Sequence, residues 1–117
     1  MVHKIAKING IELKEILFKE KLIYQKGKEK LEAVGLAHCP FGIIELRLPK
    51  KINRFEKCLR VAIHELAHIL QYQRDHKAGH ENLENIIRGI YTRCGWTMGH
   101  EFYWEESICK RMVKEEI

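Results

Sequence analysis

The sequence has little proline, a single aspartate and no long apolar run. Its two prolines, Pro40 and Pro49, fall in one short region, so the chain carries no proline-rich linker. Lys, Arg or Glu interrupts every apolar stretch before the about 18 to 20 residues that a membrane-spanning helix needs. No apolar segment follows the basic N-terminal residues either. We therefore expect no membrane span and no secretory signal, and the composition excludes a collagen, a mucin-like stalk and a repeat array.

Closely paired cysteines are also missing. No two of the four cysteines have the CxxC spacing of a zinc ribbon; they are Cys39, Cys58, Cys94 and Cys109. Without a secretory signal, we expect these thiols to be reduced in the cytoplasm. The even count leaves a disulfide framework as the alternative.

What the chain does contain is the composition of one soluble globular domain, which we place at residues 1–117. The sequence is 45% hydrophobic and 32% charged, a balance that can bury a core and still cover it with charge. The 21 Lys and Arg residues against 16 Asp and Glu give a net charge of +5. This basic balance permits association with DNA, but a solvated basic surface also accounts for it.

The first half of the chain predicts one helix and a pair of strands. The helix is expected over residues 11–33, because Asn9 and Glu12 have capping-box spacing and apolar residues recur within a stretch rich in Lys and Glu. Two short strands are expected at 33–38 and 43–48, separated by a Pro-Phe-Gly turn.

The second half predicts three more helices. One opens at Asn53, again with a glutamate three residues later, and runs to about residue 73. Its core face is formed by apolar residues at helical spacing, namely Phe55, Leu59, Ile63, Leu66 and Leu70. The others are expected at 81–92, ended by Gly95, and at 100–115. The expected fold class is thus α+β, with a small hairpin sheet packed against the Asn53 helix and the other helices.

The motif that carries chemistry is HExxH, formed by His64, Glu65 and His68. Residues four apart are neighbours on one face of a helix, so both imidazoles can reach one metal ion. Glu65 lies about 100° around the helix from His64, which places its carboxylate beside the metal. There it can take a proton from a metal-bound water.

A catalytic zinc site needs a third protein ligand and an open position for water. The extended pattern HExxHxxGxxH is excluded, because Gln71 and Arg74 occupy the required glycine and histidine positions. The third ligand must therefore come from another element. The candidates are His76, His80, His100, Glu81, Glu84, Glu101 and Glu105.

These features resemble those of the SprT-like zinc metallopeptidases, which are also grouped as minigluzincins. Gly35-Leu-Ala-His38 and Ile43-Ile-Glu-Leu46 are similar to the hairpin of that family, and the stretch from Cys58 to Gln73 is similar to its active-site helix. The resemblance covers most of the chain. It implies a leading helix, a small sheet, the HExxH helix and a later helix that begins with the third ligand.

The resemblance leaves two histidines as the third ligand, and we favour His100 over His80. His100-Glu-Phe-Tyr-Trp104 has the expected aromatic four residues after the histidine, although Glu101 replaces the expected glycine. His80 has the more typical distance of twelve residues from His68, but Glu84 stands where the aromatic is expected. If His100 binds the metal, residues 75–99 form an insertion that contains an extra helix.

The resemblance implies a cytoplasmic zinc metalloendopeptidase that acts on a protein or peptide substrate. His64, His68 and His100 bind Zn²⁺ in this interpretation, and Glu65 activates the bound water. The substrate is expected to lie as an extended strand along the edge strand 43–48. DNA-associated proteins are one substrate class that relatives suggest. The alternative function is a non-catalytic, zinc-stabilised binding module for nucleic acid or a protein, favoured if His80 and His100 both bind the metal.

Overall fold

The computed structural model describes residues 1–48, 55–76 and 79–100, and this part of the chain combines three α-helices with a small sheet. In chain order the elements are α1 (Val2–Ile8), β1 (Glu15–Lys19), β2 (Leu22–Lys26), β3 (Glu29–Ala33), β4 (Gly35–His38), the 3-10 turn η1 (Cys39–Phe41), β5 (Ile43–Arg47), α2 (Phe55–Asp75) and α3 (Leu83–Arg93). The expected fold class is confirmed at the level of α+β.

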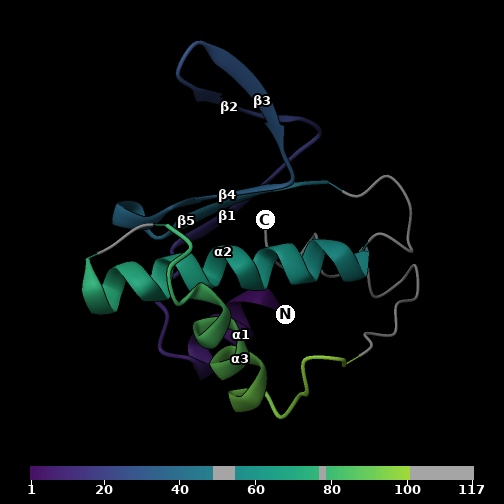
Figure 1. Cartoon of the computed structure of the whole chain (residues 1–117). Helices are drawn as coiled ribbons and strands as arrows, with labels where there is room; N and C mark the ends of the chain where they lie inside the picture. The colour runs from purple at the N-terminus through teal and green to yellow at the C-terminus, as the bar shows by residue number, and fades with distance from the viewer. Residues whose placement is uncertain (49–54, 77–78, 101–117) are drawn as a thin grey trace.

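β5 is the middle strand of a three-stranded sheet. It pairs in parallel with β1, where Glu15 is opposite Ile43, and antiparallel with β4, where His38 is opposite Ile43. β2 and β3 form a separate hairpin that stands away from this sheet (Figure 1). Since both sides of β5 are paired, the expectation that residues 43–48 form an edge strand is wrong. The edge strands of this sheet are β1 and β4.

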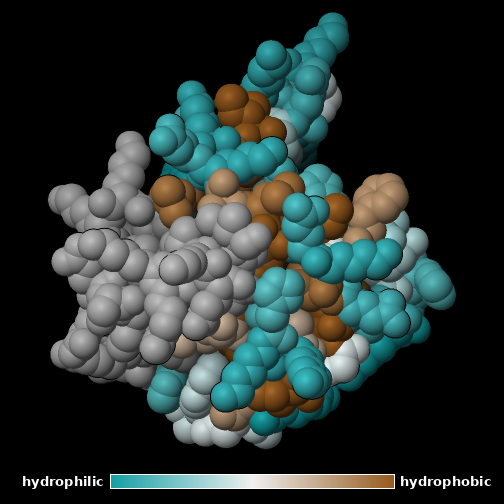
Figure 2. Space-filling view, turned by 180° about the vertical axis from the view of Figure 1, so that it is seen from behind, coloured by the Kyte–Doolittle hydropathy of each residue, from teal (hydrophilic) through white to brown (hydrophobic). Residues whose placement is uncertain are grey.

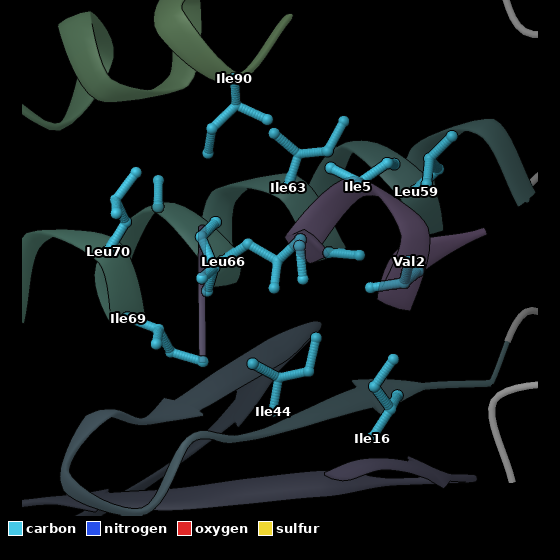
Figure 3. Close-up of a cluster of buried hydrophobic side chains, with 14 of the residues drawn as sticks. Val2, Ile5, Ile16, Ile44, Leu59, Ile63, Leu66, Ile69, Leu70 and Ile90 are labelled. Atoms are coloured by element: carbon cyan, nitrogen blue, oxygen red, sulfur yellow. The ribbon is translucent and has the colours of Figure 1, made fainter. Parts of the chain in front are cut away.

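α2 packs between the sheet and the other two helices (Figure 1). Figure 3 shows Ile16 and Ile44 pointing from the sheet toward α2, and Ile90 of α3 pointing toward Ile63. The predicted core residues of α2 that the structure describes are all buried, with exposed fractions of 3% or less; they are Leu59, Ile63, Leu66 and Leu70. The side chain of Phe55 lies outside the described residues. A helix that is buried on two sides needs a wide apolar face, which this spacing supplies.

Residues 11–33 are not helical, so the helix expected there is wrong. β1, β2 and β3 occupy this stretch. Ile16 and Phe18 are two residues apart and both pack on the core, which is the period of a strand and not of a helix. Gly27 has φ 64° in the turn between β2 and β3, a left-handed conformation that glycine adopts without steric cost.

The capping residue expected for that helix has a different role. Asn9 directly follows the short helix α1, and its Nδ2 donates a hydrogen bond to the Ile5 carbonyl at 2.8 Å. Its Oδ1 accepts a hydrogen bond from Arg93 of α3 at 3.2 Å. Asn9 therefore ends α1 and joins it to α3.

The remaining predicted elements agree with the structure where it describes them. β4 and β5 lie within the two strands expected at 33–38 and 43–48. α2 and α3 correspond to the helices expected up to about residue 73 and at 81–92. Asn53 and residues 101–115 of the last predicted helix lie outside the described residues.

The surface seen from behind is mainly hydrophilic over the coloured part, with hydrophobic areas scattered across it (Figure 2). Exposed large hydrophobic side chains come from several elements and loops; they are Met1, Ile8, Ile23, Tyr24, Val34, Phe41 and Met98. Isolated exposure of this kind is common on folded proteins. Among the helices of the described residues, none combines the length and the apolarity required to cross a membrane.

Candidate metal centre

α2 carries two histidines on one face. His64 and His68 are one helical turn apart, and their Nε2 atoms lie 3.2 Å from each other. Both residues are half-buried. Two nitrogens that bind one tetrahedral zinc ion, each at about 2.0–2.1 Å, lie about 3.3 Å apart. The observed separation therefore fits a shared metal ion.

His80 joins this pair from the segment that precedes α3. Its ring centroid lies 5.6 Å from that of His64 and 5.0 Å from that of His68. One nitrogen of each of the three side chains lies within 4.8 Å of the others, so the three histidines could hold a metal ion. Gly79, directly before His80, has φ 119°, and Asn82, two residues after it, has φ 60°. These left-handed positions let the backbone turn sharply around His80 before α3 begins.

Glu65 is buried between α2 and the first residue of β4. Glu65 as a whole is only 7% exposed. A Cβ added at Gly35 would lie 3.1 Å from Cγ and 3.3 Å from Oε1 of Glu65, and 2.5 Å from Cγ1 of Val61. Only glycine therefore lets β4 approach α2 this closely, and the close approach shields the Glu65 carboxyl from water.

Burial raises the pKa of Glu65 to about 7, because the charged form is poorly solvated at this position. A carboxyl group with a pKa near neutrality can both accept and release a proton at physiological pH. Perturbed groups of this kind are typical of functional sites.

The environment also keeps two of the histidines uncharged. Burial lowers the pKa of His68 to about 4, and repulsion from His64 and His80 adds to the effect. Burial lowers the pKa of His64 as well, with a further contribution from His80. Neutral imidazole is the form that binds a metal ion. At neutral pH, His64 and His68 are thus ready to act as ligands without first losing a proton.

His100 does not belong to the group formed by His64, His68 and His80 in the described residues. Its ring stacks on Trp96 with a centroid distance of 5.3 Å and an interplanar angle of 11°. Its backbone carbonyl accepts a hydrogen bond from Nη2 of Arg60 at 2.7 Å, and Nη1 of the same arginine donates to the Tyr91 hydroxyl at 3.1 Å. Among the described residues, the group of histidines that could hold a metal ion therefore contains the alternative candidate His80 and not the favoured His100.

The other candidate ligands are not part of the group within the described residues. His76 lies against Tyr72, with ring centroids 5.6 Å apart. Glu81 and Glu84 are exposed, and Glu84 pairs with Arg88 at 2.9 Å on α3. Glu101 and Glu105 lie outside the described residues.

Comparison of the chain with protein-family models, with curated proteins and with solved structures finds no significant match. Any functional conclusion therefore depends on the chemistry of the site itself.

We expect Glu65→Gln to stabilise the metal-free protein at pH 8 by about 1–3 kcal/mol. A rise in pKa from 4.5 to about 7 corresponds to about 3 kcal/mol of cost for the ionised form. The neutral amide avoids this cost. Because the folded-state pKa is raised, the carboxyl's contribution to stability is fully present below pH 4.5 and is lost as the pH rises through 7. The variant's advantage should therefore be absent at pH 4.5 and complete above pH 7.

Urea unfolding of chelator-treated protein at pH 4.5 and pH 8 measures this difference. Glu84→Gln, which changes an exposed carboxylate, is the matched control and should change stability by less than about 0.5 kcal/mol at either pH. An equal gain for Glu65→Gln at both pH values would contradict the assigned burial of its charge.

Proposed function

We propose that the protein is a zinc-dependent metallopeptidase in which His64, His68 and His80 bind the metal and Glu65 is the general base. The observation that carries this proposal is the convergence of three imidazole nitrogens within 4.8 Å of one another. The burial of Glu65, the residue after His64, supports it. Imidazole nitrogens suit zinc among other transition metals. Three protein ligands leave one position open, as in catalytic zinc sites and unlike closed structural ones.

The proposed ligand set changes the third ligand from His100 to His80. His80 follows His68 at the spacing that the resemblance to the SprT-like family makes typical, and His100 is engaged with Trp96. With His80 as ligand, residues 75–99 no longer need to be an insertion between the second and third ligands. Membership of the SprT-like family remains a proposal that rests on the motif, the spacing and the order of the elements.

Peptide hydrolysis at this site would need a Lewis acid and a general base. Zinc, when bound, supplies a Lewis acid that lowers the pKa of a water at its open position and polarises a carbonyl oxygen. With metal bound, Glu65, the residue after His64, would accept a proton from the attacking water and deliver it to the departing amine. In the metal-free protein, burial raises the pKa of Glu65 to about 7.

A protein or peptide in extended conformation is the substrate class that this surface favours. β4 is an edge strand of the sheet, and its first residue, Gly35, packs directly against Glu65. An edge strand offers backbone groups that an added strand can pair with. The substrate strand that the sequence assigned to residues 43–48 is accordingly reassigned to β4. Because the basic net charge permits association with DNA, DNA-associated proteins are among the proposed substrates.

The non-catalytic zinc module is the weaker candidate. It requires a closed site, and the fourth ligand considered for it, His100, is not grouped with the other three histidines in the described residues. A closed structural site would also have no use for a general base such as the motif residue Glu65.

Metal analysis of the purified protein, combined with a peptidase assay, tests the proposal. We expect one zinc ion per chain and cleavage of an unfolded protein such as casein. A chelator should abolish both, and added zinc should restore both. A folded wild-type protein that binds no zinc would refute the proposal. Stoichiometric zinc without any cleavage of a broad peptide library would favour the non-catalytic module.

A further inference from the structure

Gln71 is a buried polar residue that neither the motif nor the proposed chemistry uses. It is only 4% exposed, on the same helix as the HExxH motif and three residues after His68. That spacing puts it on the face of α2 that carries His64 and His68. Buried glutamine is uncommon and requires hydrogen-bond partners.

The hydrogen bond of Gln71 reaches the segment that supplies the third histidine. Its Nε2 donates to the backbone carbonyl of Glu81 at 2.8 Å, and Glu81 directly follows His80. The His80 carbonyl in turn accepts a hydrogen bond from the backbone N–H of Leu83 at 3.3 Å. Two hydrogen bonds thus fix the backbone at His80. One runs from the Leu83 N–H to the His80 carbonyl, and the other from Gln71 of α2 to the carbonyl of the next residue, Glu81.

The second polar atom of the same side chain shows that this arrangement is not optimised for stability. Oε1 of Gln71 is buried and has no hydrogen-bond partner in the described residues. An unpaired buried acceptor is costly, so an apolar side chain of equal length would suit this position better if stability alone were selected. What an apolar side chain lacks is the donor that reaches Glu81.

We infer that Gln71 is a positioning residue that holds His80 in reach of the metal shared with His64 and His68. This inference rests on the proposed function, since it assigns a role toward the same metal site. A ligand held in place before the metal arrives loses less conformational freedom on binding. Residues that orient a metal ligand without touching the metal typically change affinity by about 10–100-fold when removed.

Zinc affinity, measured by competition with a chromogenic chelator, tests the inference. Gln71→Met keeps the length of the side chain and removes the donor. We expect it to weaken zinc binding by about 10–100-fold, while its unfolding midpoint without metal is not lower than that of the wild type. Gln71→Asn is too short to reach the Glu81 carbonyl and should show the same loss of affinity, which keeps the test intact if the Met variant folds poorly.

Gln73→Met is the matched control. Gln73 lies two residues further along α2 and also bonds to backbone groups, accepting from the Glu12 N–H at 2.6 Å and donating to the Gly10 carbonyl at 3.1 Å. These bonds tie α2 to the loop before β1 and not to the His80 segment. Zinc affinity should stay within about two-fold of the wild type in this variant.

A double variant decides whether Gln71 acts through His80. If it does, adding Gln71→Met to His80→Ala should cause no further loss of affinity, because the ligand that Gln71 positions is already gone. A further 10-fold loss in the double variant, or wild-type affinity in both Gln71 variants, would overturn the inference and leave the proposed function intact. Absence of zinc binding in the wild type would overturn both.

Discussion

Replacing His80 by alanine is expected to weaken zinc binding by more than about 100-fold, because it removes a ligand and not merely an outer partner. The reason is geometric: a nitrogen of His80 lies within 4.8 Å of those of His64 and His68, and two histidines alone leave two positions to water. Elemental analysis after mild chelation, with folding followed by circular dichroism, measures the loss. Co²⁺ substitution, followed by visible absorption, would report the change in coordination independently.

His100→Ala is the matched control for this experiment. It removes the imidazole that stacks on Trp96 and retains the backbone carbonyl that Arg60 binds. Zinc affinity should remain within about three-fold of the wild type, with a modest loss of stability from the missing ring contact. Loss of zinc in His100→Ala alone would contradict the ligand set and restore the one favoured from the sequence. Loss in both variants would indicate a closed site and the non-catalytic module.

The HExxH helix could be predicted well because one local pattern specifies both its fold and the placement of its two histidines. Apolar residues from Leu59 to Leu70 recur at helical spacing, and the structure buries them between the sheet and two helices. The same spacing brings His64 and His68 to one face. No long-range information is needed for these two features, since helical periodicity alone determines them.

The histidine that joins His64 and His68 could not be predicted in this way, because its position depends on contacts between distant residues. His80 and His100 each follow a glycine, and the local signals conflict: Trp104 favours His100, whereas the twelve-residue distance from His68 favours His80. In the structure, the hydrogen bond from Gln71 to Glu81 and the left-handed residues around His80 bring one of them to α2. A glutamine three residues after the second histidine does not by itself predict a hydrogen bond to a distant segment. Gln71 could therefore not be identified from the sequence as a contact to the His80 segment.

The N-terminal third was mispredicted for a related reason. Its Lys- and Glu-rich composition favours a helix locally, but β1 is stabilised by parallel pairing with β5, about 28 residues later in the chain. The triplets Ile16-Leu-Phe18 and Leu22-Ile-Tyr24, each of strand-forming residues, were the available signal. Tertiary pairing overrides helix propensity here.

Glu65→Gln is expected to lower the rate of peptide cleavage by at least about 100-fold while leaving zinc content unchanged. The amide has nearly the same shape as the carboxylate but cannot accept a proton, and general base catalysis contributes about 10²–10⁴-fold. Because Glu65 does not belong to the group of three histidines, its replacement should not remove a ligand. The measurement is kcat/KM on one peptide substrate, with zinc quantified in the same samples.

Glu81→Gln provides the matched control for this variant, since Glu81 is an exposed carboxylate adjacent to the proposed ligand His80. Its hydrogen bond with Gln71 uses the backbone carbonyl, which the substitution retains. Cleavage by Glu81→Gln should stay within about two-fold of the wild type. If zinc-loaded Glu65→Gln cleaves as fast as the wild type, Glu65 is not the base and its burial against Gly35 has a purely structural origin. A large loss in Glu65→Gln together with its higher stability without metal would instead indicate that the buried carboxyl group is retained for catalysis at a cost to the fold.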